Sequence, residues 1–132
     1  MIGNHASIIG NLGQDPQLRK SKSGASVCNL SIAVDRRYNK RNPDGSSTAV
    51  KEKDWLPVVV WDGLAETTAV WLKQGSQIAV TGSLRQREWV DVKGNKRNAF
   101  EIRADDLKFL KNIRTQVEVD ARAAAAAAAL AA

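Results

Sequence analysis

A two-residue alternation of apolar and polar side chains is the feature of this sequence that most limits its fold. It is clearest from Cys28 to Asp35, where Cys28, Leu30, Ile32 and Val34 alternate with mostly polar residues. Such alternation is typical of a β-strand with one buried face, because successive side chains point to opposite sides of a sheet. Further strand patterns occupy residues 6–12, 55–61, 77–90 and 97–110.

Turn-forming residues and one helical segment separate these strands. Lys93-Gly94-Asn95 predicts a hairpin turn, whereas residues 39–53 have no alternation and contain a Pro-Asp-Gly loop signal. A helix is predicted at about residues 63–74, with Asp62 as its N-cap and Gly75 as its C-terminal stop. Three strands, a helix and two strands, with long basic hairpins, is the element order of a five-stranded OB-fold barrel.

The predicted domain organisation is a single folded unit with a tail. We expect an all-β OB-fold domain over residues 1–112, with one α-helix between strands 3 and 4, and a C-terminal extension over residues 113–132. Most of the extension from Ala121 onward is alanine, the best helix former. We favour a flexible or artificial tail, or alanines that stand for unassigned residues, over a natural Ala-rich helix.

Composition narrows the functional classes. Lys and Arg total 20 against 14 Asp and Glu, and the pI near 9.8 indicates a polyanionic partner. One cysteine and one histidine cannot form an internal disulfide or an ordinary zinc site, so we expect no metal and no cofactor. Neither a membrane-spanning run of roughly 20 apolar residues nor a secretory signal is found, so a cytoplasmic location is expected.

Strand parity places three tryptophans away from the core. If Leu56, Val58 and Val60 face inward, Trp55 and Trp61 project from the opposite side of the sheet.

The 77–90 strand repeats the arrangement. Ile78, Val80 and Leu84 form its inner face, whereas Arg85, Arg87 and Trp89 emerge on the other side. Exposed rings stack on unpaired bases and guanidinium groups bind phosphates, so this pattern suits single-stranded nucleic acid, largely irrespective of sequence.

Other aromatic residues fit a structural role. Tryptophan and arginine are also common in protein–protein interfaces, which is the alternative for Trp55 and Trp61. Trp71 lies on the apolar face of the predicted helix, and Phe100 and Phe109 have core parity. Tyr38 shares the core parity of Val34, so only a bulge or a strand end would turn it outward.

Basic residues near the predicted loops and outer faces are candidates for phosphate contacts, although many charged residues are simply solvated. The predicted set is Arg36, Arg37, Lys51, Lys53, Lys73, Arg85, Arg87, Lys96 and Arg97.

Several motifs, taken together and in order, resemble the bacterial single-stranded DNA-binding proteins over about residues 1–110. They are residues 10–16 (GNLGQDP), Trp55 with 58–60, 64–66 (LAE), 72–77 (LKQGSQ), 82–85 (GSLR) and 88–89 (EW). The resemblance implies an OB fold, coating of single-stranded DNA, a nucleoid-associated location and assembly into a homotetramer. It also implies recruitment of replication and repair proteins through an acidic C-terminal tail, which is not visible in this sequence.

The resemblance assigns base stacking to Tyr38, Trp55, Trp61 and Trp89. Tyr38 and Trp61 replace a more usual Trp and Phe, exchanges that keep an aromatic ring. Leu56 stands where many relatives have His, and Ala79 where many have Tyr, both in regions associated with subunit contacts.

Enzymatic activity is not expected. The sequence has no phosphate-binding Gly-x-x-x-x-Gly-Lys-Ser/Thr loop, and its carboxylates are scattered over different elements. We predict sequence-independent binding and protection of single-stranded DNA in replication, repair and recombination. The alternatives are a primosomal adaptor that acts through protein contacts, against which the helix between strands argues, and an RNA-binding OB domain, which no residue excludes.

Overall fold

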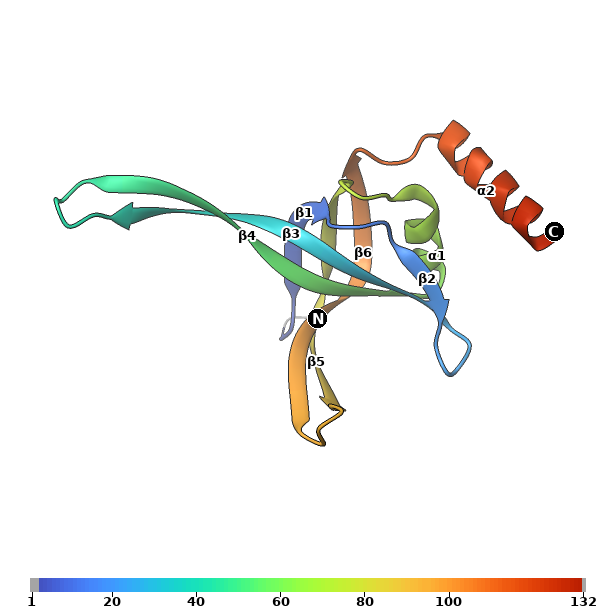
Figure 1. Cartoon of the computed structure of the whole chain (residues 1–132), viewed down its shortest axis with the longest axis horizontal. Coiled ribbons are helices and arrows are strands. Elements are labelled where there is room, and N and C mark those ends of the chain that lie inside the picture. Colours follow the sequence, from blue (N-terminus) through green and yellow to red (C-terminus); the bar gives the residue numbers. More distant parts are fainter. Residues whose placement is uncertain (1–2, 132) are drawn as a thin grey trace.

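The computed structural model describes residues 3–131, which form six strands and two helices (Figure 1). In chain order these are β1 (Ala6–Leu12), β2 (Gln17–Lys20), β3 (Ser26–Arg41), β4 (Ser47–Trp61), α1 (Asp62–Trp71), β5 (Gln77–Val90), β6 (Lys96–Lys111) and α2 (Gln116–Ala131).

Five strands close into a ring. Their order is β1-β5-β6-β4-β3, and a short pairing of β1 with β3 completes the circle. Gly10 lies at this closure, where a Cβ atom would be only 2.3 Å from the Ala33 carbonyl oxygen, so a larger residue would push the strands apart. The predicted OB fold is confirmed. The short strand β2 adds to the edge of β3, so the helix α1 follows the fourth strand and not the third.

The core fills the ring and reaches α1. Its fully buried side chains come from the ring strands, from α1 and from the segment after α1, with Ile32, Val60, Leu72, Ile78 and Val80 among them. Cys28 is also buried, its thiol contacts the Ala65 carbonyl of α1 at 3.4 Å, and burial raises its pKa. This thiol is a packing group, as its inward parity predicted.

Two hairpins extend far beyond the ring, and one of them corrects a prediction. Residues 39–53 are not a long loop: β3 continues to Arg41, and its pairing with β4 runs unbroken from Val27–Trp61 to Arg41–Ser47. Figure 1 shows this β3–β4 hairpin as the long arm on the left and the β5–β6 hairpin pointing down. Both faces of the outer β3–β4 hairpin meet water, so no alternation of polarity marks it as a strand.

The same extension explains a second wrong prediction. Phe100 is 58% exposed and Leu84 is 47% exposed, although both have core parity. They lie where β5 and β6 leave the ring, so the face that continues the core has nothing packed on it. Phe109, inside the ring, is half-buried against the core as predicted.

The boundaries of α1 also differ from the prediction. The N-cap residue is Trp61, which makes no side-chain capping bond, and Asp62 begins the helix with φ at +59°. The helix ends at Trp71 because Leu72 turns to extended backbone and enters the core. Gly75, with φ at +87°, belongs to the following turn and donates its N–H to the Leu12 carbonyl.

The short β2–β3 hairpin and the two long hairpins, β3–β4 and β5–β6, close with the same kind of turn. In the segments 21–25, 42–46 and 91–95, the first N–H donates to the fifth carbonyl, and a glycine at the fourth position donates back to the first carbonyl. These glycines have φ between +82° and +88°, a conformation that other residues adopt at a cost. This is the three-residue hairpin loop, a turn followed by one left-handed residue.

The C-terminal segment contacts α1 and the two residues that follow it. Glu118 of α2 lies 3.3 Å from the Lys73 amino group, and Arg122 donates to the Ala69 carbonyl at 3.1 Å. Before α2, the Arg114 guanidinium donates to the Leu72 carbonyl at 3.0 Å. No helix within residues 3–131 has the length and apolar character needed to cross a membrane.

Candidate nucleic-acid interface

The side of the ring strands that faces away from the core carries most of the predicted site residues. We call this side the outer face. It continues onto both hairpins and includes Trp55, Trp61, Arg37, Lys51 and Lys53 on the β3–β4 side, and Arg85, Arg87, Trp89, Arg97 and Arg103 on the β5–β6 side.

Trp55 is the most exposed tryptophan that faces this side, with 57% of its surface accessible. Its ring lies directly against Gly13. A Cβ atom at Gly13 would be 2.5 Å from the Cζ3 atom of the indole, so only glycine leaves room for the ring in this position. The backbone thus supports one side of the indole, and the exposed remainder is available for a flat ligand.

Trp61 is half-buried and lies next to a cation from another strand. β4 and β6 pair in parallel through Val58–Ile102 and Val59–Arg103, which places Arg103 on the outer face beside Trp61. The guanidinium carbon of Arg103 is 5.7 Å from the centre of the Trp61 ring, within the range of a cation–π interaction.

The outer part of β5 carries a second aromatic position. Trp89 is 41% exposed, and the guanidinium carbon of Arg87, two residues earlier on the same face, is 4.9 Å from its ring centre. Arg97 stands opposite Trp89 and bonds to the Asp91 carboxylate at 3.0 Å. This bond, together with N–H groups of the turn, lowers the pKa of Asp91.

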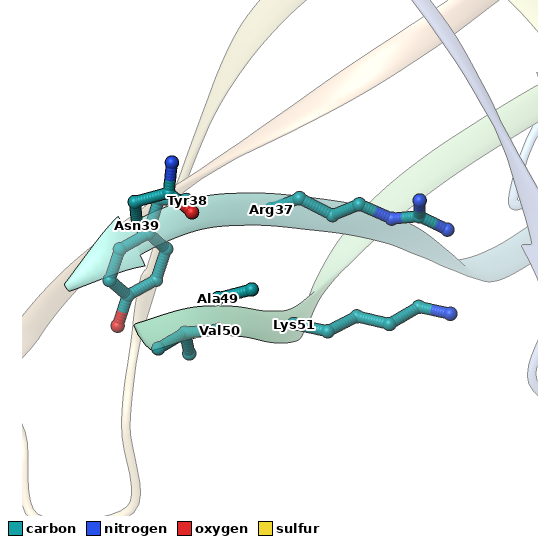
Figure 2. A pocket seen from close by; sticks show the side chains of 6 residues that line it. All are labelled: Arg37, Tyr38, Asn39, Ala49, Val50 and Lys51. Atoms are coloured by element: carbon teal, nitrogen blue, oxygen red, sulfur yellow. The ribbon is translucent and has the colours of Figure 1, made fainter. Parts of the chain in front are cut away.

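Two like charges face each other on the outer part of the β3–β4 hairpin. Arg37 and Lys51 are directly opposite in the register, and Figure 2 shows both side chains extended in the same direction. They line a hollow of about 500 Å³ with neighbouring residues of both strands. Like charges directly opposite on a sheet destabilise it, so this pair favours an anionic ligand. Lys53, the next cation on this face, stands opposite Asp35.

The reverse face of the same hairpin is neutralised within the protein. Arg36 forms ion pairs with Glu52 and, at 3.3 Å, with Asp54. Tyr38 donates its hydroxyl to Glu52 at 3.0 Å, and this bond is the main cause of the raised pKa of Tyr38. Tyr38 keeps the face of Val34, as parity predicted. It is nevertheless exposed because the strand has left the ring, without any bulge in its pairing.

The structure therefore separates the predicted site residues into groups. Arg36, Tyr38 and Lys96 lie on the reverse faces of the two hairpins, and Lys73 lies beyond the end of α1, where it pairs with Glu118. Arg103 was absent from the predicted set. Its position between the apolar residues Ile102 and Ala104 is an alternation signal that places it on the outer face. Within residues 3–131, no three His, Cys, Asp or Glu side chains cluster in a way that could hold a metal ion.

The strand order, the ring and the helix between β4 and β5 define an OB fold. Residues 3–110 match the family model described as the single-strand binding protein family. The chain therefore belongs to the single-strand binding protein family.

Individual relatives agree with this assignment. Single-stranded DNA-binding protein 1 of Xylella fastidiosa is 37% identical over 107 residues, which is 81% of this chain and 76% of that protein. The single-stranded DNA-binding protein of Caldanaerobacter subterraneus subsp. tengcongensis is 37% identical over 82% of this chain and 68% of that protein. A solved structure of Plasmodium falciparum SSB in complex with ssDNA superimposes with a TM-score of 0.73 at 26% identity, covering 82% of this chain and 95% of the other.

Proposed function

We propose that this protein binds and protects single-stranded DNA, largely irrespective of sequence, during replication, repair and recombination. The observation that carries the proposal is the outer face, where tryptophans and cations recur together on two separate hairpins. Family membership supports the same function. Binding is the whole activity, with no chemical turnover.

The mechanism combines long-range attraction with stacking. The surplus of Lys and Arg attracts the phosphate backbone and raises the rate of encounter. Bases then stack on the exposed indoles. For OB-fold single-strand binders as a class, each stacked base contributes about 1–3 kcal/mol, irrespective of base identity because every base has a flat face.

The proposal assigns roles by face. Trp55, Trp61 and Trp89 stack on bases, and the cations Arg37, Lys51, Lys53, Arg85, Arg87 and Arg97 contact phosphates. The remaining predicted residues lie away from the outer face, so any contact they make needs DNA that continues around the edge of a hairpin. These residues are Tyr38, Arg36, Lys96 and Lys73.

The resemblance to the family extends the proposal to assembly and context. We propose that residues 1–112 form the binding domain and that the protein is a homotetramer in the cytoplasm, associated with the nucleoid. Replication and repair proteins would be recruited through an acidic tail outside this sequence.

Titration of the intrinsic tryptophan fluorescence with poly(dT) at several salt concentrations tests the function. We expect strong quenching that saturates at a fixed ratio of nucleotides to protein and weakens as salt rises, with duplex DNA producing little change. A parallel titration with poly(U) tests the RNA-binding alternative. If neither polymer quenches the fluorescence, the tryptophans belong to a protein interface and the proposal is wrong.

A further inference from the structure

We propose that Arg103 is a further DNA-contacting residue, which holds the Trp61 indole in place and binds the phosphate beside the base stacked on it. This inference rests on the proposed function. It adds a contact at the place where the outer faces of the two hairpins meet.

The position of Arg103 is central to the outer face. On β6 it stands beside Val59 of β4 on one side and opposite Ser83 of β5 on the other. The pairing between β4 and β6 consists of two residue pairs, and the second of them contains Arg103. From this seam, β4 leads back to Trp55 and the β3–β4 hairpin, whereas β5 leads on to Arg85 and Trp89.

The guanidinium group of Arg103 forms no ion pair with a carboxylate within residues 3–131. The side chain is exposed. Arg36, Lys73 and Arg97 are each bonded to a carboxylate instead. Glu101, two residues earlier on the same strand, stands opposite Arg85. Arg103 thus keeps its N–H donors available.

The contact with Trp61 gives this cation a defined place. A guanidinium group is planar, so it can lie on an aromatic ring and still direct two parallel N–H groups at a phosphate. At 5.7 Å from the ring centre, Arg103 restricts the indole before DNA arrives. A base stacked on Trp61 brings its own backbone phosphate to the border of the ring, where this guanidinium is held. Arg87 and Trp89 repeat the same pairing on the β5–β6 hairpin.

The test compares Arg103→Gln, Arg103→Lys and the wild-type chain in poly(dT) titrations over a range of salt. Arg103→Gln should weaken binding roughly tenfold, the loss expected for one charged hydrogen-bonded contact. The plot of log affinity against log salt should become shallower by about 0.7, which corresponds to one phosphate contact. Arg103→Lys keeps the charge but loses the planar stack, so its salt slope should match the wild type while its affinity falls less than that of Arg103→Gln. Arg122→Gln is the matched control, because it removes a guanidinium from α2, which contacts α1 and not the outer face.

The outcomes separate this inference from the proposed function. If the wild type binds poly(dT) and Arg103→Gln has the same affinity and the same salt slope, the role of Arg103 is overturned. The proposed function is then unaffected. An equal loss in Arg122→Gln also overturns it, because the effect would then be one of net charge alone. Absence of wild-type binding overturns the proposed function itself. Thermal unfolding of each variant checks the fold, and if Arg103→Gln does not fold, the affinity and slope of Arg103→Lys decide.

Discussion

The β3–β4 and β5–β6 hairpins present similar chemistry on one face and different chemistry on the other. On the outer face, each combines an exposed tryptophan with cations that are close in the register: Trp55 with Lys51 and Lys53, and Trp89 with Arg85 and Arg87. The reverse faces have little in common. That of β3–β4 is a neutralised polar network around Glu52, whereas that of β5–β6 exposes Leu84, Phe100 and Val90.

This difference indicates which face has a shared task. Two hairpins from separate parts of the chain have little structural reason to arrive at the same aromatic and cationic pattern, since neither pattern is buried. The reverse faces show that the hairpins tolerate either polar or apolar residues where no common ligand is required. We therefore propose that a single ligand extends over both hairpins on the outer face.

The largest expected effect comes from removing the tryptophan of each hairpin. Trp55→Ala and Trp89→Ala should each weaken poly(dT) binding by about 5- to 150-fold, because each loses a stacked base. In the double variant the two losses should multiply, because the two tryptophans lie on different hairpins and each stacks on its own base. Trp71→Phe on α1 is the control and should leave affinity unchanged. If either single variant binds like the wild type, the hairpins do not act together.

A smaller effect is expected from Lys51→Gln, which should make the fold more stable and the binding of DNA weaker. Relief of the repulsion with Arg37 should raise the free energy of unfolding by about 0.2–1 kcal/mol. Loss of one phosphate contact should make the salt slope of poly(dT) binding shallower by about 0.7. Urea unfolding and salt-dependent titration measure the two quantities. Lys40→Gln, on the reverse face opposite Thr48, is the matched control and should change neither.

Salt should change the pKa values of the carboxylates at the two hairpin tips, Asp44 and Asp91, by different amounts. Hydrogen bonds from Ser46 lower the pKa of Asp44, whereas the Arg97 guanidinium is the main cause of the lowered pKa of Asp91. Because both pKa values are lower in the folded protein, both carboxylates stabilise the tips at neutral pH, and this is lost as pH falls through those values. In an NMR titration, 1 M salt should raise the pKa of Asp91 more than that of Asp44, because salt screens charge pairs. Equal shifts would contradict the assigned causes.

The smallest effect is expected on the reverse face of β5–β6. Phe100→Ser should leave poly(dT) affinity within about twofold of the wild type and change the free energy of unfolding by no more than about 0.5 kcal/mol, as for other exposed positions. The comparison is with Trp89→Ala on the opposite face of the same hairpin. A loss of affinity similar to that of Trp89→Ala would show that both faces contact DNA, and the distinction between them would fail.

The sequence predicted the parts of the molecule where one side of a strand is buried. Alternation around Cys28 and around Val58 identified the ring strands and placed Trp55 and Trp61 on the outer face, because a buried core enforces a two-residue period. The period disappears when both faces of a strand are exposed. Residues 39–53 were therefore read as a loop, although 39–41 and 47–53 pair as regularly as the rest of the hairpin and only 42–46 form a turn.

The remaining differences depend on long-range packing. Phe100 has the parity of the core, but only the length of the hairpin shows that nothing covers it. Leu72 ends α1 early because the core takes up its side chain, and a local signal at Gly75 cannot reveal that. The pairing of Arg103 with Trp61 requires β4 and β6 to be neighbours, and these strands are far apart in the sequence.

The turn shared by the three hairpins allows a residue at each tip to be changed without altering the pairing of the strands. Each tip closes through bonds of its first, fourth and fifth residues, the fourth being the left-handed glycine, so its second residue takes no part in the backbone bonds that close the turn. Exposed loop tips of this kind tolerate inserted residues well. Pro43 and Val92, the exposed second residues of their turns, are thus suitable attachment points for a fluorophore at the end of each long hairpin, and Lys22 offers a third. Dyes at these three positions would allow distances from each hairpin tip to a labelled strand to be measured, and these distances would report the path of the bound strand over the protein.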